Sequence, residues 1–283
     1  MTAAEIASRT IERMVTRGAT RELVLAATTV ILISRFAEGP LAWGVGVALL
    51  AAVALGSLQV LGEGETPTRS SGVPIESLAL PATAAFAVFG AIRLVPVGII
   101  LVPALLAGAW LIARTLSTEA RILGASSGPS GADRTAILVQ ALGVAFLGFI
   151  GIAALVPGGL PEPGVVVSAP PTGPQLAILA TADAVIAFLL GYRSAALRSS
   201  NLRDVAWFAL TSAIVVAIAA VALRAMEIPR LLGPALLVLV LFLWDAVHGT
   251  PPSRRRDPRR IWETVLLLVL GLVVVAWSLR LRA

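Results

Sequence analysis

The chain has 283 residues, of which 58% are hydrophobic and only 13% are charged, and its mean hydropathy is +0.92. Charged residues make up about a quarter of an ordinary soluble domain, so this composition excludes that class and indicates a multi-pass membrane protein. The 22 basic residues, all Arg, exceed the 16 acidic residues and give a net charge of +6. The Arg clusters carry no interleaved aromatic residues. We therefore expect no nucleic-acid partner.

The rarest residue types narrow the possible chemistry. The chain has no Cys and a single His, His248. Thiolate sites and multi-His metal sites are therefore excluded, and we expect no metal and no cofactor. The sequence also lacks the motifs of zinc peptidases, P-loop nucleotide hydrolases and diphosphate-binding membrane enzymes. No catalytic residue is assigned, and an enzyme is the less favoured class.

Taken in order, the chain predicts an all-helical membrane bundle. Residues 1–19 place apolar side chains such as Ile11 and Met14 on one helical face and charges elsewhere, which predicts an amphipathic helix on the membrane surface. Residues 20–283 are expected to form one transmembrane domain. Its predicted spans cover residues 20–37, 41–61, 76–95, 97–113, 135–156, 175–192, 205–223, 231–247 and 261–279.

The first of these spans is short. It has only twelve uninterrupted apolar or weakly polar residues between Glu22 and Arg35, a length that also suits a segment that does not cross. The prediction is therefore nine spans, or eight if this one fails to cross. With nine spans, sixteen of the 22 Arg lie on the side of the N-terminal tail. The positive-inside rule makes that side cytoplasmic and the C-terminus external. We expect a bacterial plasma membrane.

The sixth span carries Asp183 close to its middle. An Asp at that depth costs about 2.5 to 3.5 kcal/mol on the insertion scale, which nearly cancels the gain from the apolar residues of the span. Asp183 shares a helical face with small residues, namely Ala180, Ala184, Ala187 and Gly191. This face predicts close packing against other helices, with Asp183 inside the bundle. Its carboxylate is either a proton or cation site, or an acid that is neutral or hydrogen-bonded to a neighbouring helix.

A second candidate site lies at the end of the eighth span. Asp245 and His248 share a helical face beside Trp244, and five arginines follow: Arg254, Arg255, Arg256, Arg259 and Arg260. Such a cluster could bind an anionic lipid headgroup at the cytoplasmic face. The alternative is structural, with Trp244 as an interface anchor, Asp245 balancing the positive charge and the arginines fixing the topology.

These features predict a membrane protein whose activity the sequence does not define. The first expectation is a non-enzymatic permease or transport-like protein that uses Asp183 for coupling or substrate binding. The alternative is a non-catalytic membrane subunit or scaffold that binds other membrane subunits. A lipid-phosphate-handling enzyme built on Asp245 and His248 is a third, weaker possibility. In each case the lipid bilayer is the expected environment.

Overall fold

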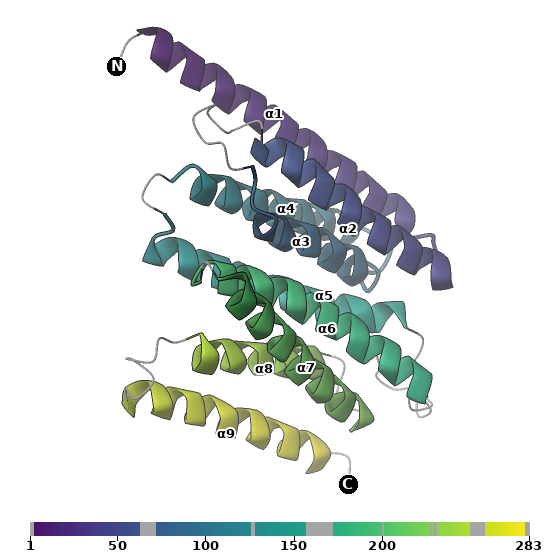
Figure 1. Cartoon of the computed structure of the whole chain (residues 1–283). Coiled ribbons are helices and arrows are strands. Elements are labelled where there is room, and N and C mark those ends of the chain that lie inside the picture. The colour runs from purple at the N-terminus through teal and green to yellow at the C-terminus, as the bar shows by residue number, and fades with distance from the viewer. Residues whose placement is uncertain are drawn as a thin grey trace. The chain divides into compact units, whose positions relative to one another are not determined.

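The computed structural model describes residues 3–62, 72–125, 128–156, 172–199, 201–226, 228, 231–249 and 258–280. Within these ranges every regular element is an α-helix, labelled in Figure 1. The helices are α1 (Ala3–Ser34), α2 (Gly39–Gly62), α3 (Glu76–Ile92), α4 (Leu101–Leu123), α5 (Gly131–Leu155), α6 (Gly173–Ala196), α7 (Leu202–Ala225), α8 (Leu232–His248) and α9 (Pro258–Arg280). The all-helical prediction is thus confirmed for the described residues.

Each predicted span has a helix at its position, but the helices differ in their capacity to cross a bilayer. Five of them, α2, α4, α5, α6 and α7, are long and apolar enough to do so. By contrast, α3 and α8 have 17 residues each, and the apolar part of α9 is limited to Trp262–Trp277. A count of five candidate spans is therefore what length and composition support among the described residues.

Two helices differ from the sequence prediction. The expected surface helix over residues 1–19 and the first span are one continuous helix, α1, because the junction contains Gly18 but no proline, and glycine costs only about 1 kcal/mol within a helix. The second difference is α4, which continues to Leu123, whereas its span was predicted to end at residue 113. Its last turns remain helical because Thr115, Leu116 and Glu119 recur at helical spacing on a buried face.

The chain forms two units, residues 1–141 and 142–283. In the first unit α3 contacts α1, α2 and α4 (Figure 1). Every residue of α3 from Leu80 to Gly90 is buried, as expected for a helix that is apolar on all sides. The other three helices expose large apolar side chains, and thus α3 is the core of this unit.

The second unit is built by neighbours along the chain: α6 packs on α7, α7 on α8 and α8 on α9. Two local signals start its first helices. Thr172 and Gln175 form a capping box before α6, and the side chain of Asn201 accepts a hydrogen bond from the backbone N–H of Arg203 before α7. The short connector at residues 197–201 makes α6 and α7 an antiparallel hairpin, which places the end of α7 near the start of α6.

Candidate functional site: a buried carboxylate in the α6–α7 hairpin

Asp183 lies on α6, and its side chain is fully buried. Of the small residues predicted on the same side of the helix, Ala180, Ala187 and Gly191 are buried as well, and Ala184 is partly exposed. Ile178 and Val185, on the other side, are half exposed. The two-sided character predicted from the sequence is therefore present, with the carboxylate on the packed side.

Close packing with α7 explains why that side is small. A Cβ atom on Gly191 would lie 2.5 Å from the hydroxyl oxygen of Ser212 and 3.5 Å from Cα of Ala209, so a larger residue would force the helices apart. The Ser212 hydroxyl donates to the carbonyl oxygens of Ala209 at 2.8 Å and Ala187 at 3.4 Å. Helices α6 and α7 are thus in close contact at Gly191, eight residues along α6 from Asp183.

The partner of Asp183 is Arg224, the penultimate residue of α7. Nη2 of Arg224 donates to Oδ2 of Asp183 at 2.6 Å, and only 11% of the arginine side chain is exposed. A helical side chain leans toward the N-terminus of its own helix, so Arg224 extends from the end of α7 back along the seam. An arginine so close to a helix end can usually reach the membrane surface, yet this one points inward.

Sequence reasoning missed Arg224 as this partner. The signal was available, because Arg224 is the sole charged residue of α7 beyond its first turn and the connector between the two helices is short. What the sequence could not supply was the direction of the side chain. Counting Arg224 only as a charge on one side of the membrane overlooked its reach into the hairpin.

The ion pair uses one carboxylate oxygen. Oδ1 of Asp183 is buried and meets no hydrogen-bond donor in the described parts of the chain. A carboxylate offers about four acceptor positions, and leaving a buried acceptor without a donor costs about 1–3 kcal/mol. A buried oxygen of this kind calls for a specific explanation, such as a bound proton, ion or water. Chemically, the pair can therefore take up a proton or a small cation at Oδ1.

The second candidate site is arranged differently from the sequence hypothesis. Both oxygens of Asp245 on α8 are bound by Arg198, with Nη1–Oδ2 at 3.0 Å and Nη2–Oδ1 at 2.7 Å, and Ser194 donates to Oδ1 at 2.8 Å. The guanidinium of Arg198 also lies over the ring of Phe208, 4.9 Å from its centroid. This α6–α7–α8 clasp joins three helices, which favours a structural role for Asp245.

The remaining members of that candidate site are only partly described. His248 stacks on Trp244, with ring centroids 3.8 Å apart, and Arg259 pairs with Glu263 at 3.2 Å on the exposed surface of α9. Arg254, Arg255 and Arg256 lie outside the described residues, as does the side chain of Arg260. The lipid-headgroup hypothesis therefore stays a prediction, now with Asp245 engaged by Arg198.

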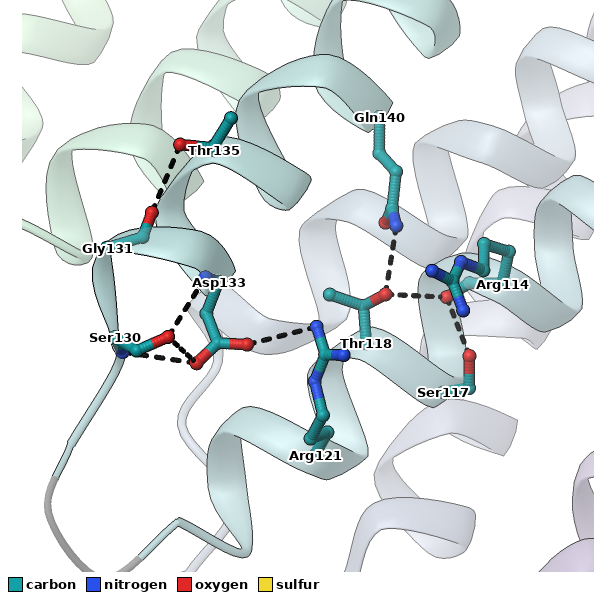
Figure 2. A network of polar contacts seen from close by, with 9 residues as sticks. All are labelled: Arg114, Ser117, Thr118, Arg121, Ser130, Gly131, Asp133, Thr135 and Gln140. Atoms are coloured by element: carbon teal, nitrogen blue, oxygen red, sulfur yellow. Dashed lines mark hydrogen bonds and ion pairs between the residues drawn. The ribbon is translucent and has the colours of Figure 1, made fainter.

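A third polar cluster joins α4 to α5 in the first unit (Figure 2). Arg121 pairs with Asp133 at 3.0 Å, and Asp133 exchanges hydrogen bonds with Ser130 as a capping box at the start of α5. Gln140 donates to the hydroxyl oxygen of Thr118 at 2.9 Å. Beside Thr118 lies Glu119, a second fully buried carboxylate, which sequence reasoning missed because it lies beyond the predicted end of the span at residue 113.

No protein family, curated protein or solved structure that we compared matches this chain. Its function must therefore be argued from its own residues. Among those the structure describes, no group of three or more His, Asp or Glu is placed to hold a metal ion. Among these residues, the Asp183–Arg224 pair is the arrangement with the clearest capacity to bind a proton or a small cation.

Proposed function

We propose that this protein is a permease or transport-like carrier of nine spans, in which Asp183 binds a proton or a small cation. The observation that carries the proposal is the one-sided ion pair, a buried carboxylate with one oxygen on Arg224 and the other open. Intramembrane acids are rare because of their cost and commonly mark ion or proton pathways. Arg224 then serves as a resting counter-ion that the incoming cation or proton replaces.

The membrane setting is supported by the exposed surfaces of the helices. Large apolar side chains are exposed along several of them, including Leu55 on α2, Trp110 on α4 and Ile218 on α7, each about two thirds exposed. On α9 the apolar segment begins at Trp262 and ends at Trp277, and tryptophan is the residue preferred at membrane interfaces. A helix of 17 residues, such as α3 or α8, lies at the lower limit for a span.

For the orientation we propose a cytoplasmic N-terminus and an external C-terminus in a bacterial plasma membrane. The support is the distribution of arginine, with sixteen of 22 on the N-terminal side of a nine-span arrangement. In that orientation Arg224 enters the α6–α7 hairpin from the external face.

A non-catalytic membrane subunit or scaffold is the second candidate. The close approach at Gly191 and the clasp around Arg198 favour it, because both fix α6 to its neighbours. In such a protein the Asp183–Arg224 pair would only hold the hairpin together, and Asp183 would exchange with no ligand.

A hydrophobic carbodiimide separates the two candidates without knowledge of the transported solute. This reagent modifies a carboxyl group that takes up a proton in apolar surroundings. We expect an adduct at Asp183, located by peptide mass spectrometry, which forms faster at acidic pH and is slowed by Na⁺ if the site also binds cations. The Asp183→Asn variant should show no adduct at this position. The matched control is Glu119→Gln, which removes the second buried carboxylate and should still form the adduct at Asp183.

Absence of an adduct at Asp183 from acidic to alkaline pH, in protein that is folded by size-exclusion chromatography, would contradict the carrier proposal. That outcome is the one expected for a permanently closed structural pair.

A further inference from the structure

Two arginines lie at one end of the first unit, one after α1 and one after α3. Each donates hydrogen bonds to carbonyl groups at or just beyond the end of the other helix. Arg35 follows α1 and donates to the carbonyl oxygens of Ile92, the last residue of α3, at 3.4 Å, and of Val95, three residues further on. Arg93 follows α3 and donates to the carbonyl oxygens of Ser34, the last residue of α1, at 2.8 Å, and of Ala37, three residues further on. We refer to this reciprocal arrangement as the arginine clasp.

The clasp supplies hydrogen-bond donors to carbonyl groups at the two helix ends, of which those of Ser34 and Ile92 also accept the backbone N–H groups of Ala37 at 2.9 Å and Val95 at 3.2 Å. The last carbonyl groups of a helix have no partner within the helix, and at an aqueous surface solvent satisfies them. Here the arginine of the neighbouring segment does so for the carbonyl groups of Val95 and Ala37, and Arg93 also lies over the ring of Phe89, 5.3 Å from its centroid. Non-helical backbone at membrane depth requires internal partners of this kind.

The two connectors around the clasp expose large apolar side chains, which is unusual for loops in water, although the shorter connector also carries Arg35 and Glu38. They link α1 to α2 and α3 to α4 and lie at the same end of this unit (Figure 1). Their exposed apolar residues form what we term the apolar apex: Phe36 is 84% exposed, Val97 81%, Ile99 92% and Ile100 63%. Two independent features, satisfied carbonyl groups and exposed apolar loops, thus indicate a water-poor setting for this end.

The length of α3 leads to the same conclusion. Its 17 residues span about 26 Å at about 1.5 Å per residue, less than the roughly 30 Å of a hydrocarbon core. If Glu76 at the start of α3 lies at one interface, the other end of the helix falls short of the opposite interface. The apex is also continuous with exposed apolar residues on the sides of the adjoining helices, Leu41 on α2 and Val102 on α4.

We infer that the apolar apex is inserted into the lipid at one face of the bilayer, among headgroups and upper acyl chains, with the arginine clasp satisfying the helix ends beneath it. Glu38 is exposed on the same connector, which limits the insertion to headgroup depth. The inference rests on the proposed membrane embedding and not on carrier activity. The occupant of this surface is lipid, since the apex continues the surface that the adjoining helices present to the bilayer.

Spin labels test this depth directly, because the chain contains no native cysteine to remove. Nitroxides are attached to Ile99→Cys and Val97→Cys in protein reconstituted into lipid nanodiscs, and their collision rates with oxygen and with a water-soluble nickel chelate are measured. Leu106→Cys, on the exposed side of α4, is the hydrocarbon control, and Ala132→Cys, exposed in the first turn of α5, is the aqueous control. Both apex labels are expected to favour oxygen over nickel more strongly than the Ala132 label does, with values between those of Ala132 and Leu106.

Each other outcome overturns the inference. Nickel access equal to that of Ala132 would place the apex in water, and shielding from both reagents would mean that protein covers it. If Leu106 itself is open to nickel, the membrane embedding fails as well, which separates that failure from failure of the apex alone. The two apex labels are independent, so poor folding of one variant still leaves the other.

Discussion

The Asp183–Arg224 pair predicts an unequal response to removal of its two members. Removing one partner of a buried ion pair costs about 3–5 kcal/mol when the other charge is left with no compensation. This applies to Arg224→Gln, because the side chain of Asp183 is fully buried. In Asp183→Asn the remaining arginine lies one residue from the end of α7 and has a short path to the surface. Loss of the Asp183 carboxylate should therefore lower the free energy of unfolding by less, about 1.5–3 kcal/mol, which is the value of a hydrogen bond to a charged group.

The double variant Asp183→Asn with Arg224→Gln removes both charges and should recover much of the loss of Arg224→Gln. Contacting residues show coupling energies of about 0.5–3 kcal/mol, so the deviation from additivity is measurable. The assay is the free energy of unfolding in a detergent titration, followed by circular dichroism. Arg280→Gln, at the exposed end of α9, is the matched control and should change little. Equal losses in the two single variants, or a strictly additive double variant, would refute the assigned geometry.

Three further predictions concern the packing of α6 on α7, the α6–α7–α8 clasp around Arg198, and the topology. Gly191→Val should destabilise the α6–α7 hairpin by about 1–3 kcal/mol through overpacking, whereas Gly143→Val, where a Cβ meets nothing within 4 Å, should cost little; equal thermal shifts in the two would contradict the close seam. Arg198→Ala should lower thermal stability by only about 1 kcal/mol because this pair is partly exposed, and Arg198→Lys should not restore it because lysine lacks the guanidinium fork; full rescue by lysine would exclude the bidentate contact. Single cysteines at Ser130 and Ser168 should react with an impermeant thiol reagent from opposite sides of sealed vesicles, and reaction from one side would refute the nine-span orientation.

Local pattern was sufficient to place the helices and the carboxylate. An apolar run marked the position of each helix of the described chain, although only five of the helices are long and apolar enough to cross a bilayer, and the spacing of Ala180, Ala187 and Gly191 placed Asp183 on the packed side. These are properties of a helix and its own side chains, and they do not require knowledge of the neighbouring helix.

The partners could not be predicted in the same way. Arg224 and Arg198 reach Asp183 and Asp245 across 41 and 47 residues, and such pairing depends on the register between helices. The prediction for the end of α4 was wrong for another reason: the span was ended at residue 113, before the polar residues, although Thr118 and Glu119 are buried on a helix that continues to Leu123. A polar sequence distinguishes a segment in water from a segment in lipid. It does not distinguish a loop from a helix whose polar face is buried.

The reach of Arg224 also has a directional consequence for access to Asp183. The guanidinium extends from the end of α7 into the seam, so it lies between the carboxylate and the face at which α7 ends. A cation that approaches Asp183 from that face must pass the arginine or displace it. Shortening the side chain in Arg224→Gln should therefore open the carboxylate to that face, whereas the close α6–α7 contact at Gly191, toward the other end of α6, is unchanged.

A membrane-impermeant, positively charged carbodiimide applied to sealed proteoliposomes of known orientation measures this access. We expect faster modification of Asp183 in Arg224→Gln than in the native protein when the reagent is on the α7 C-terminal side, and no change when it is on the other side. Arg280→Gln supplies the control for a general effect of removing a positive charge. Equal modification from both faces would show that loss of the arginine loosens the whole hairpin and does not open one path, and the assignment of Arg224 as a one-sided barrier would be wrong.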